Sequence, residues 1–148
     1  MPQQDIFTLC YISRRAPGLT DAQVVDGIVL PAMAKNRRLD ITGCLWFDAD
    51  RFVQFLEGPT QDVQNIYAAI ERDNRHTDVA LLTSGPLADR SFDRFSMRAI
   101  GQSRPAAVAA LLELCDGVGV QAARVRDDLV AIVGSVTREL RQWPLATA

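Results

Sequence analysis

The chain has 148 residues, of which 48% are hydrophobic and 23% are charged, and these proportions are those of a globular domain with its own core. Its formal net charge of -2 and its pI near 5.3 argue against a dedicated nucleic-acid-binding protein, which would present a basic face. No apolar run is long enough to span a bilayer, and no basic segment followed by an apolar one opens the chain. We therefore expect neither a membrane anchor nor a signal peptide.

The few metal-binding or redox-active side chains are scattered. Cys10, Cys44 and Cys115 are odd in number, widely spaced and set among apolar residues, which is typical of reduced core thiols in a cytoplasmic protein. His76 is the only histidine and there is no CxxC pair, so we expect no zinc site.

Strand and helix patterns alternate over residues 5–100. Residues 6–13 alternate in the manner of a strand, with Tyr11 and Ser13 on one face. Thr20, followed three residues later by a glutamine, has the capping-box pattern of a helix start. Pro31 falls inside the apolar stripe of this helix and is expected to kink or shorten it.

The next segment begins with a predicted hairpin of two strands, residues 41–47 and 51–57. Thr60 is expected to cap a second helix, and two more strands are predicted over residues 79–83 and 92–100. The order β-α-β-β-α-β-β predicts an α+β, ferredoxin-like fold with a five-stranded mixed sheet and two core helices on one face.

The remaining residues, 103–148, have a different character. They predict two helices, over 106–115 and 122–143, each with an apolar side. The sheet face opposite Tyr11 and Gln54 is also apolar, and a sheet that is apolar on both faces needs a cover on both. We therefore expect a domain over residues 1–102 and a C-terminal helical extension over 103–148 that packs on the sheet.

A glutamine lies inside a strand that is predicted to be buried. Phe52, Gln54 and Leu56 alternate, so their side chains share one face. A buried amide without hydrogen-bond partners costs roughly 1–3 kcal/mol. Backbone groups or a trapped water could satisfy Gln54, and so could a ligand.

Other polar residues are predicted on the same side of the sheet, namely Tyr11, Ser13 and Asn36. A phenol, a hydroxyl and two carboxamides include no catalytic base, so they do not form a hydrolytic triad. They are neutral donors and acceptors, which suit the edge of a flat heterocycle held in a slot between two helices and lined by Ile and Val.

Five segments together resemble the BLUF domain, a flavin-binding sensor of blue light. In order they are Leu9-Cys-Tyr-Ile-Ser13, Asn36 running into Ile41-Thr-Gly43, Phe52-Val-Gln-Phe-Leu-Glu-Gly58, Asp73-Asn-Arg-His76, and Arg90-Ser-Phe92 with Ser96-Met97. The resemblance covers about residues 5–100.

The resemblance implies that FAD lies between the two core helices. The cofactor-binding residues that it implies are Tyr11, Ser13, Ile28, Lys35, Asn36, Gln54, Ile66, Arg75 and His76. Asn36 would hydrogen-bond the pyrimidine edge of the ring, and Gln54 would sit between Tyr11 and the flavin. Light would draw an electron and a proton from Tyr11 to the flavin and leave Gln54 rotated or tautomerised. Met97 would be the third photoactive residue.

Two positions depart from the family pattern, and three others have an alternative interpretation. Phe95 stands where the family commonly has tryptophan, and Lys35 where many relatives have asparagine or histidine, which puts a second contact to the pyrimidine edge in doubt. Arg75 and His76 could instead be cations at a helix C-terminus, and Met97 a flexible core residue.

The chain is expected not to be an enzyme but a short BLUF protein without a cyclase or phosphodiesterase domain. Its signal would pass to an unknown downstream protein or through a change in a homo-oligomer, a dimer or larger. Two other classes stay open: a light-independent ferredoxin-like regulator that binds a ligand or a partner, and a small ferredoxin-like enzyme. The lack of a base beside a nucleophile argues against the enzyme.

Overall fold

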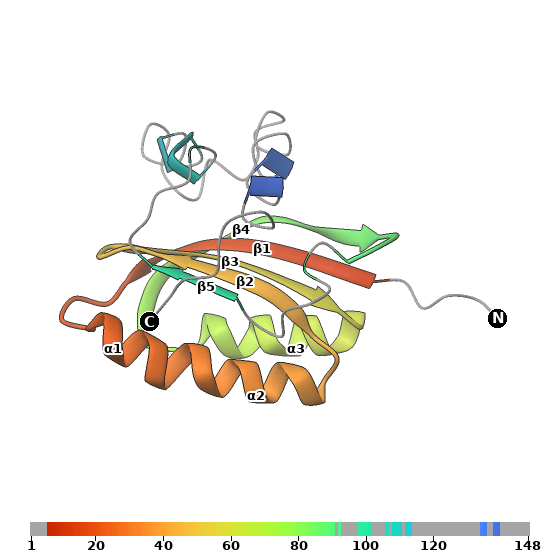
Figure 1. Cartoon of the computed structure of the whole chain (residues 1–148), viewed down its shortest axis with the longest axis horizontal. Coiled ribbons are helices and arrows are strands. Elements are labelled where there is room, and N and C mark those ends of the chain that lie inside the picture. The colour runs from red at the N-terminus through yellow and green to blue at the C-terminus, as the bar shows by residue number, and fades with distance from the viewer. Residues whose placement is uncertain are drawn as a thin grey trace.

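A five-stranded mixed sheet forms the centre of the computed structural model (Figure 1), in which the strands follow the order β4-β1-β3-β2-β5. The structure describes residues 6–90, 92, 98–101, 106, 108–110, 112–113, 134–135 and 138–139. Antiparallel pairing joins β1 to β3 and β4, and β2 to β3, whereas β5 runs parallel to β2. The predicted ferredoxin-like fold is confirmed. The strands are β1 (Ile6–Arg15), β2 (Thr42–Phe47), β3 (Arg51–Gly58), β4 (His76–Leu87) and β5 (Arg98–Gly101).

Two helical segments cover one face of this sheet (Figure 1). The first runs without a break through α1 (Asp21–Val24), the π-helical turn η1 (Val25–Val29) and α2 (Leu30–Arg38), and the second is α3 (Thr60–Glu71). The predicted capping box is confirmed, because the Thr20 hydroxyl accepts from the backbone N–H of Gln23, and the Gln23 side chain accepts from that of Thr20.

Pro31 does not shorten the first helix, which continues to Arg38. A proline lacks the N–H that would bond to the carbonyl four residues before it, and its ring crowds that carbonyl. Here the helix widens just before the proline into the π-helical turn, in which the N–H of Leu30 donates to the carbonyl of Val25, five residues earlier.

Thr60 is not the cap of α3, which corrects the expectation from the sequence. Pro59 is the N-cap, and Thr60 is the first helical residue, with no side-chain bond capping the helix. The backbone supplies the first link, since the N–H of Val63 donates to the Pro59 carbonyl at 3.0 Å.

The last two strands differ from the prediction in their bounds. β4 starts at His76 and continues to Leu87, so it is longer at both ends than the predicted strand over 79–83. The fifth strand is described only as Arg98–Gly101, and Phe92 lies in a bend before it. Phe95 and Met97 lie outside the described residues.

Both faces of the sheet are buried, as their apolar patterns predict. Leu9, Leu45 and Leu56 belong to the core under the helices, whereas Ile12 and Trp46 on the opposite face are completely buried. Figure 1 shows the described helical residues of 106–113 on the side of the sheet away from α3. The domain boundary at residue 102 and the packing of residues 103–148 on the sheet stay predictions. Within the described ranges, no helix is long and apolar enough to cross a membrane.

Gly43 allows β2 to lie close to β3. It pairs with Leu56, and a Cβ atom built on it would lie 2.1 Å from the carbonyl oxygen of Phe55. No side chain fits at this distance, so a larger residue would push β2 away from β3, the strand that carries Gln54.

We expect Gly43→Ala to lower the free energy of unfolding by about 1–3 kcal/mol or more, because overpacking a fixed backbone forces the strands to shift. Urea unfolding followed by circular dichroism measures this change. Ser84→Ala is the control, since Ser84 is an exposed strand residue and surface substitutions usually stay within about 0.5 kcal/mol. Equal midpoints for the two variants would contradict the close approach of β2 and β3.

Candidate functional site

A cavity of about 230 Å³ lies between the sheet and the two helical segments. Of the nine residues predicted to bind the cofactor, eight line this cavity and Ser13 does not. Those that line it come from six elements and one turn: Tyr11 (β1), Ile28 (η1), Lys35 and Asn36 (α2), Gln54 (β3), Ile66 (α3), Arg75 in the turn before β4, and His76, the first residue of β4. The topology therefore brings together residues that are up to 65 positions apart in the chain, from Tyr11 to His76.

Tyr11 and Gln54 form a buried pair in the wall of the cavity. They are direct partners in the antiparallel register of β1 and β3, and the Tyr11 hydroxyl donates a hydrogen bond to Oε1 of Gln54. Their exposed fractions are 4% and 6%. Side chains of directly opposed residues lie on the same face and close together, so the register itself creates this contact.

Burial keeps the Tyr11 phenol in its neutral form. It raises the pKa of Tyr11 well above the usual value near 10, with smaller contributions from the neighbouring Cys10, Tyr67 and Asp73. The Tyr67 ring lies 5.8 Å from that of Tyr11. The phenolic proton is therefore retained at neutral pH and remains available for the bond to Gln54.

Asn36 is the buried polar residue of the first helical segment. It is 3% exposed and lines the cavity near the end of α2, whereas Lys35 beside it is exposed. The Asn36 carbonyl also accepts the N–H of Ile41 at 2.8 Å. This bond fixes the turn from α2 into β2 and, with it, the position of the carboxamide.

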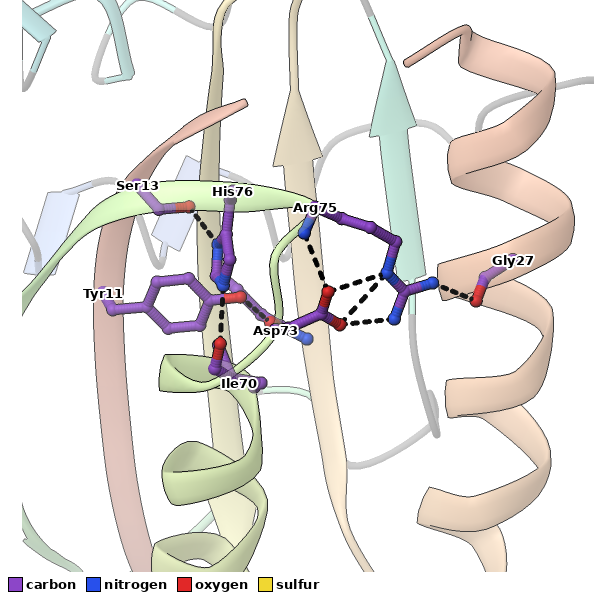
Figure 2. A network of polar contacts seen from close by, with 8 residues as sticks. Tyr11, Ser13, Gly27, Ile70, Asp73, Arg75 and His76 are labelled. Atoms are coloured by element: carbon purple, nitrogen blue, oxygen red, sulfur yellow. Dashed lines mark hydrogen bonds and ion pairs between the residues drawn. The ribbon is translucent and has the colours of Figure 1, made fainter. Parts of the chain in front are cut away.

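Arg75 and Asp73 form an ion pair at the cavity wall (Figure 2). The guanidinium lowers the pKa of Asp73, chiefly through side-chain hydrogen bonds, and Asp73 raises the pKa of Arg75 in return. The backbone N–H of Arg75 also donates to Asp73 Oδ1 at 2.9 Å. The segment Asp73–His76 is thus a turn followed by a strand, and not the last turn of α3, which ends at Glu71.

Arg75 also donates a hydrogen bond to the backbone carbonyl of Gly27, to which Pro31 cannot donate. Nη1 of Arg75 donates to the carbonyl oxygen of Gly27 at 2.7 Å, and Gly27 is the residue four positions before Pro31. A proline has no N–H for that carbonyl, so the guanidinium supplies a donor in its place. This contact ties the first helical segment to the turn before β4.

His76 lies beside Tyr11 and contacts the side chain of Ser13 (Figure 2). Nδ1 of His76 is 2.7 Å from the Ser13 hydroxyl, and Nε2 is 2.6 Å from the Ile70 carbonyl oxygen near the end of α3. Ser13 therefore contacts the predicted site through His76, which corrects the expectation that no base lies beside a hydroxyl group of the chain.

The prediction of the site omitted several residues that line the cavity. Asp73 had a sequence signal, because an acidic residue at the start of an Asp-Asn turn often bonds the backbone two residues later. Pro31 and the apolar wall residues had none that separates them from ordinary core. In the part of the chain that the structure describes, no three His, Cys, Asp or Glu side chains are placed to hold a metal ion.

Comparison with known proteins agrees with this geometry. The sequence model of the family described as "BLUF: Sensors of blue-light using FAD" matches residues 6–98. The chain belongs to the BLUF family. It is a blue-light sensor that uses FAD, and the buried Tyr11–Gln54 hydrogen bond lies in its cavity.

Two curated relatives show how this BLUF sequence recurs within longer proteins. The chain is 36% identical over 85 residues to the photoactivated adenylate cyclase subunit beta of Euglena longa, which covers 57% of this chain and 10% of that protein. It is 36% identical over 73 residues to the blue light- and temperature-regulated antirepressor BluF of Escherichia coli (strain K12), covering 49% and 18%. The matched region thus spans less than a fifth of either relative.

Two solved structures share the fold over most of the chain. The photo-activated state of BlsA superposes with a TM-score of 0.76 at 22% identity and covers 97% of this chain and 99% of its own. The dark state of BlrB superposes with a TM-score of 0.71 at 22% identity and covers 93% and 96%.

The residues of the cavity fit FAD. Hydrogen-bonding groups from Tyr11, Gln54 and Asn36 are buried in its wall, as the edge of a flavin ring requires. Leucine, isoleucine and phenylalanine side chains supply apolar surface for the ring faces, and the cations of Lys35 and Arg75 suit the charged part of the cofactor. The volume is slightly below the roughly 300–1,000 Å³ typical of whole-ligand pockets, so it suits the ring better than the entire molecule.

The high pKa of Tyr11 can be tested in Tyr67→Phe, which leaves Tyr11 as the only phenol because the chain has two tyrosines. With carbon-13 at tyrosine Cζ, we expect no phenolate signal up to about pH 11 in the folded protein, and a full one after unfolding in urea at that pH. The folded state prefers the neutral phenol, so its stability should fall as the pH rises above about 10, by up to about 1.4 kcal/mol per pH unit. Ionisation of folded Tyr11 near pH 10 would contradict its burial.

Proposed function

We propose that Tyr11 and Gln54 convert light absorption into a rearranged hydrogen bond in the wall of the cavity. The observation that carries this proposal is the buried bond from the Tyr11 hydroxyl to Oε1 of Gln54. A phenol is an oxidisable group with a transferable proton, and a carboxamide has a donor and an acceptor that can exchange places. The two residue types therefore complement each other at this contact.

The chain's own residues define the steps. When bound, the flavin absorbs blue light and supplies an excited electron acceptor. Tyr11 supplies an electron and its phenolic proton, and the hydrogen bond to Gln54 gives that proton a first acceptor at Oε1. Burial makes a free charge costly in this wall, so loss of the electron favours loss of the proton. Both return to Tyr11, and the change that persists is the exchange of donor and acceptor at Gln54.

Five of the other predicted residues are assigned to holding the cofactor. Asn36 would bond the pyrimidine edge of the ring, and Ile28 and Ile66 would supply apolar surface for it. Lys35 and Arg75 would supply positive charge for the phosphates. The support is their shared position around the cavity, together with the burial of Asn36 and the exposure of Lys35.

We further propose that the output is an interaction and not a reaction catalysed by these 148 residues. The family model matches the sensor region, residues 6–98, and two structures of similar extent, BlsA and BlrB, share the fold. A downstream protein or a change in a homo-oligomer would then receive the signal. The tail, 103–148, is the part of the chain beyond the sensor and is the proposed contact region.

The first experiment is absorption spectroscopy of the purified protein. We expect a yellow protein whose flavin bands shift slightly to the red under blue light and return in the dark. Tyr11→Phe should keep the flavin and abolish the red shift, because the phenolic proton is gone. Gln54→Leu should do the same, because no amide remains to exchange its bond. Tyr67→Phe is the matched control and should keep the shift. A normal shift in either Tyr11→Phe or Gln54→Leu would refute the proposed roles.

The tail is tested by deletion of residues 103–148. Ile12, Trp46 and Val53 are completely buried on the sheet face away from the helices, and Val108 and Leu112 of the tail are buried as well. Removal of the cover should expose an apolar face and cause aggregation or a lower unfolding midpoint. Light scattering and thermal unfolding measure both. A truncated protein that stays monomeric and equally stable would show that the tail does not cover the sheet.

A further inference from the structure

Both ring nitrogens of His76 have hydrogen-bond partners inside the protein (Figure 2). Its side chain is 8% exposed, with Nδ1 at 2.7 Å from the Ser13 hydroxyl and Nε2 at 2.6 Å from the Ile70 carbonyl oxygen. Ser13 belongs to β1, and Ile70 to the last turn of α3. The imidazole therefore links the strand that carries Tyr11 to the helix across the cavity.

The chemistry of the partners fixes the protons on this ring. A backbone carbonyl can only accept, so Nε2 must carry the hydrogen and donate it to Ile70. In the neutral ring, Nδ1 is then the acceptor, and the Ser13 hydroxyl donates to it. Neither nitrogen can turn to a bound cofactor without losing one of these bonds, so only the remaining surface of the ring is presented to the cavity.

The ring also contacts the residues around the Tyr11–Gln54 pair. It forms edge-to-face ring pairs with Tyr11, with ring centroids 6.0 Å apart and planes at 72°, and with Phe52, at 6.1 Å and 76°. Phe52 pairs with Ser13 in the strand register, just as Gln54 pairs with Tyr11. His76 thus limits the sideways movement of the phenol and of the strand position next to the glutamine.

We propose that His76 is a positioning residue that holds the Tyr11 phenol against Gln54, through its bonds to Ser13 and to the end of α3. The expected effect of His76 on the light response rests on the proposed function. Its expected effect on the geometry of the Tyr11–Gln54 hydrogen bond in the dark does not depend on that proposal. His76 is then no ligand of the cofactor, and its effect on the photoreaction passes entirely through Tyr11.

Two substitutions separate the polar bridge from the aromatic packing. His76→Phe keeps a ring edge for Tyr11 and Phe52 but removes both nitrogens. His76→Gln loses the ring but keeps an amide that can donate to the Ile70 carbonyl. Both are made in the Tyr67→Phe background, where the phenolic proton resonance of Tyr11 is the only one. That resonance is recorded in the dark, and the rate of return from the red-shifted spectrum is recorded after light.

We expect His76→Phe to shift the phenolic proton resonance and to change the rate of dark return by at least about threefold, as the loss of a buried hydrogen bond does. The phenolic proton resonance of Tyr11 in His76→Gln should lie closer to that of the parent protein. Urea midpoints are measured alongside, because a merely structural residue would lower the midpoint and leave the resonance and the rate unchanged. That outcome would overturn the proposal, as would a glutamine variant no closer to the parent than the phenylalanine variant.

Ser13→Ala keeps the test decisive if His76→Phe does not fold. This variant leaves the imidazole and its bond to Ile70 in place and removes only the link to β1. It should shift the same resonance in the same direction, and an unchanged resonance would overturn the proposal. A protein without any red shift would refute the proposed function alone, because the dark resonance still reports the position of the phenol.

Discussion

The pairing register of β1 and β3 is the constraint on which the site depends. It sets Tyr11 opposite Gln54 and Ser13 opposite Phe52, and it therefore decides which polar groups face the helices. A slip of one residue would move every side chain of a strand to the other face of the sheet. Gly43 contributes from the neighbouring strand, since only a residue without a side chain allows β2 to approach the Phe55 carbonyl so closely.

Two side chains at or directly before the start of β4 contact backbone carbonyls of the two helical segments. Pro31 deprives the Gly27 carbonyl of its usual donor, and Arg75 supplies one. The carbonyl of Ile70, near the end of α3, accepts the backbone N–H of Asp73 at 3.0 Å and receives a second donor from His76. In both cases the side chain comes from the turn before β4 or from its first residue, so the helices and the sheet are joined by residues that also line the cavity.

The sequence was sufficient for features that depend on local patterns. Alternation placed Tyr11 and Gln54 on one face, and the Thr20 capping box marked the start of the first helix. Prediction from the sequence failed where a contact with a residue distant in the chain determines the local structure. Pro31 suggested a kinked or shortened helix, whereas the helix continues past it through a π-helical turn, and Arg75, 44 residues further on, contacts the Gly27 carbonyl. Nothing in the neighbourhood of His76 in the sequence indicates Ser13 or Ile70 as its partners.

β3 connects the two sides of the sheet, because successive residues point to opposite faces. Gln54 faces the cavity, while Phe55 and Glu57 face away from it. The Phe55 ring packs on Phe92 at 5.7 Å, and the buried Glu57 carboxylate accepts the backbone N–H of Phe92 and the hydroxyl of Thr42. The chain that follows β4 is therefore anchored to the strand that carries the glutamine, one to three residues away. A rearrangement of Gln54 that moves the β3 backbone must also move this anchor, whereas one confined to the amide group leaves it in place.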